Sequence, residues 1–235
     1  MHQADSVADA LWQGARQLAR VMELEAETPA GRVHVLSQMV GEVNAANLLA
    51  AVAVGVALGL DAETIGRRLS RAGAVPGRME LLGTTPAGAR VWVDYAHTAD
   101  ALERALASVR RLVTGELWCV FGCGGERDRD KRPAMGRAAD RRCDRVVLTN
   151  DNPRGEAPDA ILTAVRGGMD RLEPEVIPER GAAIRHALQS AGYGAAVVIA
   201  GKGHEREQVL ANEILDFSDR EVVQDWLRTA GQGVG

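Results

Sequence analysis

The chain has 235 residues, enough for one large domain or one and a half, and its 46% apolar and 26% charged content is ordinary for a globular protein. A net charge of -4 and an aromatic content of only 3% argue against nucleic-acid binding. Because no apolar run reaches membrane-spanning length and no apolar signal core opens the chain, we expect neither a membrane span nor secretion.

The first part of the chain is predicted to be mainly helical. Apolar residues at three- and four-residue spacing from Val7 to Met22 predict a helix within residues 1–30, and Val33 and Val35 predict a short strand. The small apolar residues from Leu48 to Leu60 predict a long helix that packs inside the protein.

Asn47 stands at the start of this predicted helix and has two interpretations. It is an N-cap or first-turn residue, or its amide hydrogen-bonds a ligand base or sugar. A second helix is predicted from Asp61 to Ala72, with Asp61 as its cap and a Glu63–Arg67 pair on its surface.

A linker is predicted from Gly73 to Arg78, because glycine and proline interrupt both helices and strands. We therefore divide the chain into residues 1–77, a mainly helical first domain, and residues 78–235, a second domain.

The second domain alternates strands and helices with regular spacing. Strands are predicted at Val91–Asp94, Leu117–Phe121, Arg145–Thr149, Glu175–Ile177 and Ala195–Ala200, with a further edge strand at Ile214–Phe217. Helices are predicted at Asp100–Val113, Pro133–Arg142, Pro158–Leu172 and Gly181–Ala191, and after Ser218, which with Glu221 forms a capping box. Repeated strand–helix units predict an α/β fold, an open doubly wound Rossmann-like sheet that is mainly parallel.

A polar loop, Asp151-Asn152-Pro153-Arg154, follows directly on one of these buried strands. Ligands of open parallel sheets bind at the carboxyl ends of strands. Arg154 can grip a carboxylate, whereas Asp151 and Asn152 can take up ammonium groups and amide hydrogens. The loop suits a zwitterionic, amino-acid-like ligand, although the same residues also make a good turn.

Three further strand ends carry polar loops, and parallel strands would place all four loops along one edge of the sheet. These loops are Asp94–His97, Gly122–Asp128 and Gly201–Glu205. Neither glycine-rich loop is a P-loop, because the terminal Lys-Ser or Lys-Thr is missing. His97 and His204 are either catalytic or helix-capping residues.

The cysteines are Cys119, Cys123 and Cys143, and no pair has the spacing of a zinc site or a disulfide framework. We expect free thiols in a reducing, cytoplasmic compartment, with Cys119 as a core residue.

Taken in order, six motifs resemble those of the Mur ligases, and among them the type that adds meso-diaminopimelate to the peptidoglycan stem peptide. The motifs are Gly77–Glu80 (Gly-Arg-Met-Glu), Val93–Thr98 (Val-Asp-Tyr-Ala-His-Thr), Phe121–Asp128 (Phe-Gly-Cys-Gly-Gly-Glu-Arg-Asp), Lys131–Gly136 (Lys-Arg-Pro-Ala-Met-Gly), Asp151–Arg154 and Gly201–Glu205 (Gly-Lys-Gly-His-Glu). The resemblance covers roughly residues 28 to 228.

This resemblance implies an amide ligase of peptidoglycan precursor synthesis that uses ATP and Mg²⁺. ATP would phosphorylate the carboxylate of UDP-MurNAc-L-Ala-D-Glu, and the amine of the diamino acid would attack the acyl phosphate. By position in the family motifs, the resemblance implies that the residues contacting diaminopimelate are Arg127, Asp151, Asn152, Pro153, Arg154, Gly201 and Glu205. In the same way, it implies that Asn47, Arg78 and Asp94 contact ATP.

Parts of the family pattern are missing from this sequence. It contains neither the UDP-binding domain, nor the Gly-Lys-Thr P-loop, nor the magnesium ligands, and residues 1–27 do not match the family. We therefore expect residues 1–77 to be a helical remnant of the central ATP-binding domain, with no catalytic residue of its own. The chain would keep the diamino-acid half-site and would not activate the carboxylate alone.

Two alternatives belong to other functional classes. The chain is either a non-catalytic diaminopimelate-binding module or one half of a split ligase that a separate amino-terminal half completes. A nucleotide-dependent oxidoreductase on the same fold is disfavoured, because the first strand-to-helix turn lacks Gly-x-Gly-x-x-Gly.

Overall fold

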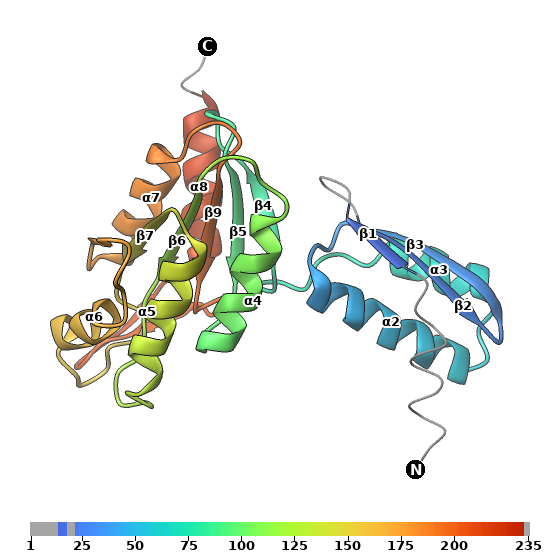
Figure 1. Cartoon of the computed structure of the whole chain (residues 1–235), viewed down its shortest axis with the longest axis horizontal. Coiled ribbons are helices and arrows are strands. Elements are labelled where there is room, and N and C mark those ends of the chain that lie inside the picture. The colour runs from blue at the N-terminus through green and yellow to red at the C-terminus, as the bar shows by residue number, and fades with distance from the viewer. Residues whose placement is uncertain (1–13, 18–21, 233–235) are drawn as a thin grey trace. The chain divides into compact units, whose positions relative to one another are not determined.

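The computed structural model describes residues 14–17 and 22–232 (Figure 1). The chain divides into two compact units, Met1–Ala74 and Val75–Gly235, so the division falls within the segment predicted as a linker.

In its described part, residues 14–17 and 22–74, the first unit combines a three-stranded antiparallel sheet with two helices. Its elements are β1 (Gly14–Gln17), β2 (Met22–Thr28), β3 (Gly31–Ser37), α2 (Glu42–Ala57) and α3 (Ala62–Ser70). Alternate residues of β2 and β3 point inward, and Leu24 lies opposite Val35. They pack against Leu48, Val52 and Ile65 of the two helices, which gives this unit its own core.

The helix predicted within residues 1–30 is wrong for Met22–Thr28, which form a strand, and for Gly14–Gln17. Met22, Leu24 and Ala26 are buried in alternation with glutamates, and a period of two is the pattern of a half-buried strand. The rest of that prediction, residues 1–13 and 18–21, lies outside the described residues. The first unit is thus not purely helical.

Asn47 is neither a cap nor a first-turn residue, because α2 begins at Glu42. Asn47 lies in the second turn of α2 and is exposed. The strand expected at Val33 and Val35 and the cap and surface pair of the second helix are confirmed. The helix expected from Leu48 to Leu60 is α2, but it is not fully packed inside the protein, because Val54 is 58% exposed. Asp61 caps α3 by accepting a hydrogen bond from the Thr64 backbone N–H at 2.7 Å, and Glu63 pairs with Arg67 at 3.4 Å.

The second unit is built on a six-stranded sheet in the order β4-β5-β9-β6-β7-β8. Its strands are β4 (Glu80–Thr84), β5 (Arg90–Asp94), β6 (Leu117–Phe121), β7 (Arg145–Leu148), β8 (Glu175–Val176) and β9 (Ala196–Ala200). All neighbours pair in parallel except β4, which is antiparallel to β5. This confirms the open, mainly parallel sheet. The sequence did not predict β4.

Helices cover both faces of this sheet. They are α4 (Ala99–Arg110), α5 (Lys131–Arg142), α6 (Pro158–Arg166), α7 (Arg180–Ser190) and α8 (Asp219–Gln232). In Figure 1, α4 and α5 lie in front of the sheet, and α7 and α8 lie behind it. Val120, Val197 and Ile199 of the central strands pack with Ile184 and Leu188 of α7 in one buried cluster. Doubly wound packing of this kind fixes the strand ends on which a site can be built.

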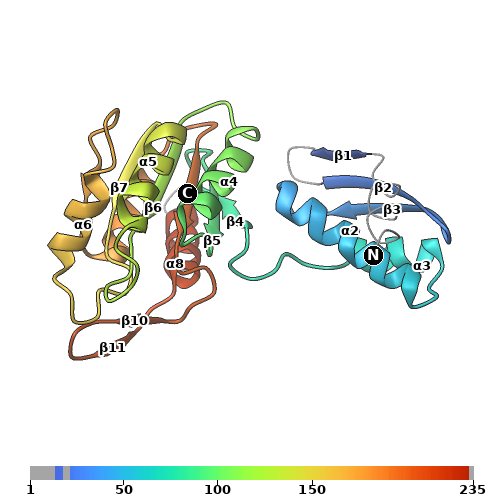
Figure 2. The same cartoon turned by 60° about the horizontal axis from the view of Figure 1, so that its bottom comes forward.

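Residues 214–217 were predicted as an edge strand of the main sheet, and this is wrong. Ile214–Asp216 (β11) pairs instead with Glu207–Val209 (β10) in a separate two-stranded hairpin, which Figure 2 shows at the lower edge of the unit. The capping box is half formed. Ser218 Oγ accepts from the Glu221 backbone N–H at 3.4 Å, but the Glu221 carboxylate pairs with Arg206.

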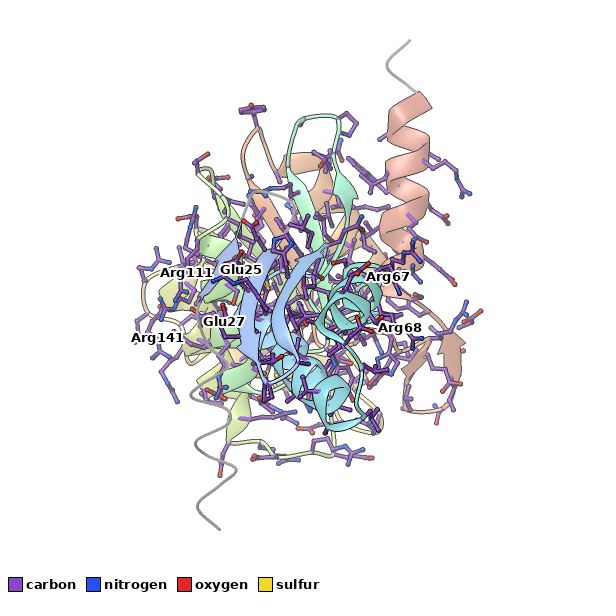
Figure 3. The ribbon with its side chains drawn as sticks, turned by 90° about the vertical axis from the view of Figure 1, so that its right-hand side faces the viewer. Glu25, Glu27, Arg67, Arg68, Arg111 and Arg141 are labelled. Atoms are coloured by element: carbon purple, nitrogen blue, oxygen red, sulfur yellow. The ribbon has the colours of Figure 1, made fainter. Side chains whose placement is uncertain are left out.

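Charged side chains lie mostly on exposed surfaces. In Figure 3, Glu25 and Glu27 project from β2, and Arg67 and Arg68 project from α3. Across residues 14–17 and 22–232, no helix is both long enough and apolar enough to cross a membrane.

Candidate functional site

The four polar loops predicted to lie along one sheet edge meet in a single pocket of about 420 Å³. They follow β5, β6, β7 and β9, which are neighbours in the sheet and run in the same direction. The pocket is lined by Tyr95, His97, Thr98, Gly124, Arg127, Asp128, Lys131, Asp151, Asn152, Arg154, Gly201 and Glu205. Of the seven residues carried over for diaminopimelate, only Pro153 is outside this lining. Pro153 is buried.

Glycines let the loop after β6 pack directly on the loop after β7. A Cβ atom on Gly122 would lie 2.0 Å from the Thr149 carbonyl oxygen, and one on Gly125 would lie 1.9 Å from that of Pro153. The Gly125 backbone N–H donates to the Asn152 carbonyl oxygen at 2.9 Å. Only glycine permits so close a contact of two backbones, so the two loops form one rigid wall.

Three cationic side chains reach this pocket: Arg127, Lys131 and Arg154. Arg154 adopts a left-handed backbone with φ of 52° and donates through Nη1 to the carbonyl oxygens of Gly125 at 3.0 Å and Asn152 at 3.3 Å. Within the described residues, Arg154 and Arg127 make no ion pair with a carboxylate. Both guanidiniums therefore keep their charge available to an anionic ligand group.

The acidic side of the pocket is formed by Asp151 and Glu205, with Asn152 between them. The Asn152 Nδ2 donates to Glu205 Oε2 at 3.2 Å. Its Oδ1 accepts from Lys202 Nζ at 2.8 Å and from the Val209 backbone N–H at 3.0 Å. Both acceptor positions of the Asn152 oxygen are thus used by donors of the protein.

Lys202 was not predicted as part of the site. Its side chain is fully buried beneath the pocket, and it also donates to the Glu207 carbonyl oxygen at 2.7 Å. The signal in the sequence is a lysine between two glycines that directly follow a buried strand. Gly201 and Gly203 adopt positive φ values of 115° and 55°, which turn the chain so that Lys202 points inward.

Tyr95 and the two histidines form an aromatic group beside the pocket. The Tyr95 ring centroid lies 4.7 Å from that of His97 and 5.5 Å from that of His204. His97 does not cap α4, because Thr98 takes that role by accepting from the Ala101 backbone N–H. Among the described residues, no group of three or more His, Cys, Asp or Glu side chains could hold a metal ion.

Arg78 and Asp94, carried over as ATP contacts, lie close together in the second unit. The Arg78 guanidinium stacks over the Tyr95 ring at 4.6 Å from its centroid. Asp94 accepts from the backbone N–H groups of Met79 at 2.7 Å and Ala96 at 2.8 Å. Burial raises the pKa of the Asp94 carboxyl, and these hydrogen bonds oppose that rise. Asn47 belongs to the first unit.

The cysteines form no disulfide, as expected from the sequence, and Cys119, Cys123 and Cys143 are all buried. Cys123 directly precedes the pocket residue Gly124, but burial raises the pKa of its thiol to about 12. A thiol of that pKa is not a nucleophile near neutral pH.

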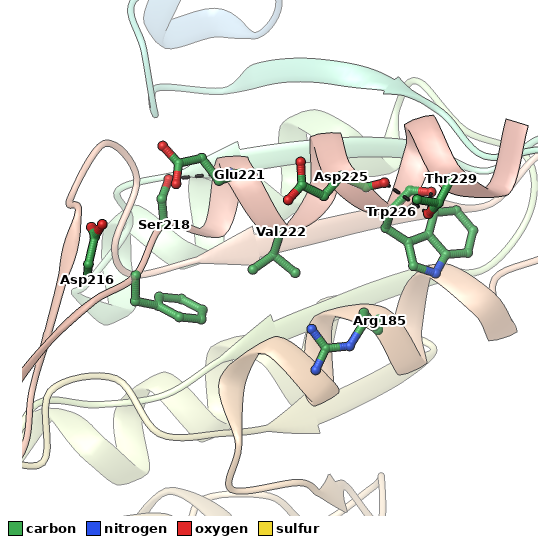
Figure 4. Close-up of a pocket in the computed structure, with 9 residues that line it drawn as sticks. Arg185, Asp216, Ser218, Glu221, Val222, Asp225, Trp226 and Thr229 are labelled. Carbon is green, nitrogen blue, oxygen red and sulfur yellow. Dashed lines mark hydrogen bonds between the residues drawn. The ribbon is translucent and has the colours of Figure 1, made fainter. Parts of the chain in front are cut away.

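A second hollow, of about 360 Å³, lies along α8 and includes Arg185 of α7 (Figure 4). Three of its four charged groups are already paired, and the fourth is Asp216. Arg185 contacts Glu179 at 3.1 Å, Asp225 contacts Arg228 at 2.6 Å, and Glu221 contacts Arg206. Because the first pocket offers unpaired guanidiniums and this one does not, the pocket at the strand ends is the candidate site.

Comparisons with known proteins agree on one family. A protein-family model described as "Mur ligase, glutamate ligase domain" matches residues 77–203. A curated relative from Gloeobacter violaceus is named UDP-N-acetylmuramoyl-L-alanyl-D-glutamate--2,6-diaminopimelate ligase. It is 49% identical over 201 residues, which are 85% of this chain and 41% of the relative. A protein of the same name from Vibrio vulnificus is 42% identical over 227 residues, 95% of this chain and 45% of the relative.

Solved structures of Mur ligases also resemble this chain. One described as a UDP-N-acetylmuramoyl-L-alanyl-D-glutamate--2,6-diaminopimelate ligase matches with a TM-score of 0.70 and 34% identity, over 93% of this chain and 45% of that chain. A UDP-N-acetylmuramate-alanine ligase from Thermotoga maritima matches with a TM-score of 0.66 at 17% identity, over 94% of this chain and 45% of that one, which indicates a shared fold. The chain spans about two fifths of the length of the curated relatives it matches.

Proposed function

The chain belongs to the Mur ligase family, and from this premise we propose that its second unit holds the amino acid that an ATP-dependent amide ligase adds to a peptidoglycan precursor. The names of its relatives support meso-diaminopimelate as that amino acid and UDP-MurNAc-L-Ala-D-Glu as its acceptor. In our proposal the first unit corresponds to the end of the central, ATP-binding domain, and the reaction takes place in the cytoplasm.

In the proposed reaction, the acceptor carboxylate takes the γ-phosphoryl group of ATP and ADP leaves. A neutral amine of diaminopimelate then attacks the acyl phosphate, and the amide forms as phosphate and a proton are released. The role of this chain is to bind the diamino acid and orient it. Holding a nucleophile in a fixed position lowers the entropic part of the barrier.

The pocket matches the charges of meso-diaminopimelate, which has an ammonium and a carboxylate at each end. We assign a ligand carboxylate to Arg154 and Arg127, and a ligand ammonium to Asp151 and Glu205. Arg154 is already oriented by two backbone carbonyl groups, so little side-chain entropy would be lost when it binds a carboxylate. Asn152 would contribute through its amide N–H.

The observation that carries this proposal is the convergence of Arg127, Asp151, Arg154 and Glu205 on one pocket. They come from three loops that are far apart in the sequence. Their spacing reflects no repeat or helix periodicity. Within the described residues the two arginines make no ion pair with the two acids, and a binding site for a zwitterion explains why both signs of charge gather there.

For ATP we propose Arg78 as a contact to phosphate charge, since it is exposed and free of ion pairs within the described residues. The two oxygens of Asp94 hold the Met79 and Ala96 backbones, so we propose that Asp94 supports the conformation beside Arg78 as well as any contact to ribose. Asn47 remains a proposed contact from the first unit. Mg²⁺ would accompany ATP in this proposal, and we assign none of the described residues as its ligand.

Calorimetric titration with meso-diaminopimelate and, separately, with lysine tests the proposal. Lysine lacks the second carboxylate, and losing a hydrogen bond to a charged group costs about 1.5–3 kcal/mol, roughly a 10- to 150-fold weaker affinity. Arg154→Ala should abolish this preference, and Arg228→Ala on the far surface of α8 should retain it. Equal binding of both amino acids, or of neither, by a folded chain would contradict the proposal.

A second assay separates catalysis from binding. The chain is mixed with ATP, the UDP-linked dipeptide and diaminopimelate, and tripeptide formation is measured. Turnover would identify a self-sufficient ligase. Selective binding without turnover would favour a diaminopimelate-binding module or half of a split ligase.

A further inference from the structure

Lys202 is a fully buried cation in direct contact with the polar side chains of the pocket floor. Its Nζ donates to Asn152 Oδ1 at 2.8 Å and to the Glu207 carbonyl oxygen at 2.7 Å. The carboxylates of Asp151 and Glu205 each lie 3.5 Å from the same nitrogen. All of the proton-bearing directions of the ammonium are therefore used inside the protein.

The contact with Lys202 sets which way the Asn152 amide faces. With Oδ1 turned to Lys202 and to the Val209 N–H, Nδ2 must face Glu205 Oε2, to which it donates at 3.2 Å. The reversed amide would bring two oxygen atoms together at that point and would place Nδ2 against the ammonium. Lys202 thereby orders a chain of contacts that ends at the Glu205 carboxylate in the pocket.

Lys202 also changes the charge that a ligand meets. The pocket lining contains three cations, Arg127, Lys131 and Arg154, and three acids, Asp128, Asp151 and Glu205. The lining alone is neutral, and the buried ammonium directly beneath it makes the local sum positive by one charge. A positive sum disfavours a ligand with net positive charge, such as lysine, relative to a diamino diacid whose charges cancel.

We propose that Lys202 is a positioning and specificity-determining residue of the diamino-acid pocket. It fixes Asn152 and Glu205, and it supplies the positive charge that discriminates against net-cationic diamino acids. This inference rests on the proposed function, because it specifies how the same pocket selects its ligand. Lys202 contacts no ligand in this account and acts through its neighbours.

The test compares meso-diaminopimelate and lysine binding to the wild-type chain and to Lys202→Met, which keeps the length of the side chain and removes its charge. We expect diaminopimelate affinity to fall about tenfold or more, in line with the loss of a charge-assisted hydrogen-bond network. Lysine affinity should fall less or rise, so that the preference shrinks about tenfold. If both affinities fall by the same factor, Lys202 is only structural and the proposal is overturned.

A double-mutant cycle shows whether Lys202 acts through Asn152. In an Asn152→Ala background, Lys202→Met should have a much smaller effect on diaminopimelate affinity than in the wild type. Additive effects would contradict the proposed route. If Lys202→Met does not fold, Lys202→Gln takes its place, since it is also neutral and keeps a polar group that can still donate.

Nuclear magnetic resonance tests the positioning role of Lys202 without a ligand, and therefore independently of the proposed function. If the wild-type chain binds no diaminopimelate, the proposed function fails, and the side-chain amide signal of Asn152 still decides the positioning role. That signal, assigned by its loss in Asn152→Ala, should shift in Lys202→Met and in Lys202→Gln. If it is unchanged in a folded neutral variant, Lys202 does not position Asn152.

Discussion

The Glu156 carboxylate accepts two hydrogen bonds from the Arg132 guanidinium, each 2.7 Å long. Arg132 is buried in α5, and Glu156 stands just after the loop that contains Arg154. The pair therefore ties the helix after β6 to the loop after β7, next to the wall that Gly125 and Pro153 form. The Arg132 guanidinium lowers the pKa of Glu156 to about 2.

This pair should make the second unit sensitive to acid. A carboxyl whose pKa falls from 4.5 to about 2 on folding stabilises the fold fully above pH 4.5, and that contribution is lost as the pH falls towards 2. We expect the urea midpoint of the wild type to drop more steeply over this interval than that of Glu156→Gln. Glu173→Gln, which removes an exposed partner of Arg166, is the control and should keep the wild-type slope. Parallel curves for wild type and Glu156→Gln would refute the role of the pair.

Gly77 should tolerate no side chain. Its φ is +69°, and a Cβ atom would lie 2.3 Å from the Gly203 carbonyl carbon and the His204 nitrogen. We expect Gly77→Ala to destabilise the second unit by about 2–4 kcal/mol, from steric overlap and left-handed strain together. Because Gly203 and His204 belong to the loop that brings Glu205 to the pocket, diaminopimelate binding should weaken as well.

Two other glycines distinguish steric overlap from left-handed backbone strain as the cause of the stability loss in Gly77→Ala. Gly59 has φ of +76° with nothing within 4 Å of a Cβ atom, so Gly59→Ala should cost the first unit about 1 kcal/mol from strain alone. Gly73 has neither feature, and Gly73→Ala should stay within about 0.5 kcal/mol of the wild type. Urea unfolding followed by circular dichroism gives all three values. A Gly77→Ala cost no larger than that of Gly59→Ala would show that the backbone contact is readily relieved.

Removing one partner of the Arg180–Asp219 ion pair should destabilise the fold more than replacing both partners by apolar residues. Both side chains are fully buried, and the guanidinium contacts the two carboxylate oxygens at 2.7 Å each. Burial opposes the charge on Arg180, but Asp219 more than compensates and raises the pKa of Arg180. Arg180→Met leaves a buried carboxylate unpaired and should cost about 3–5 kcal/mol.

The double variant Arg180→Met, Asp219→Leu removes both charges and should cost clearly less than Arg180→Met alone, because neither charge is then left unpaired. Chemical denaturation of Arg180→Met, of Asp219→Leu and of the double variant measures the free energy of unfolding of each, and hence the coupling between the two residues. The pairing is unimportant if the double variant is destabilised by the sum of the two single-variant costs, or as much as Arg180→Met alone. In that case packing and backbone contacts, such as the hydrogen bond from Arg180 to the Ala200 carbonyl oxygen at 3.0 Å, outweigh the pairing.

The sequence predicted the strand ends well because their signal is local. Val146 to Leu148 are apolar and buried, and the polar loop at Asp151 follows at once. It could not predict β4, because Glu80–Thr84 contains a glycine and becomes a strand by pairing with β5 around a bulge. The first unit was misjudged at Met22–Thr28, where glutamates favour a helix locally and the pairing with β3 overrides them.

The same limit applies to the site. Arg127, Asp151, Arg154 and Glu205 could be identified as pocket residues because their motifs are ordered along strand ends. Lys202 could not, because a lysine in a loop is ordinarily solvated, and its burial goes with contacts to Asn152 in another loop and to Glu207. The direction of the Asn152 amide likewise follows from these contacts and from no local pattern.

Arg154 offers a last test, in which two variants should lose binding alike but differ in stability. Its backbone lies in the left-handed region with φ of 52°, and its N–H donates to the Val209 carbonyl oxygen at 3.1 Å. Arg154→Ala and Arg154→Gly both remove the guanidinium, so both should lose selective diaminopimelate binding. Glycine adopts this conformation without the Cβ strain of alanine, so Arg154→Gly should be more stable than Arg154→Ala by about 1 kcal/mol. Urea midpoints and calorimetry on the two variants measure both quantities. If the alanine variant is the more stable, or if either variant still prefers diaminopimelate to lysine, then the loop is held for a reason other than presenting this guanidinium to a carboxylate.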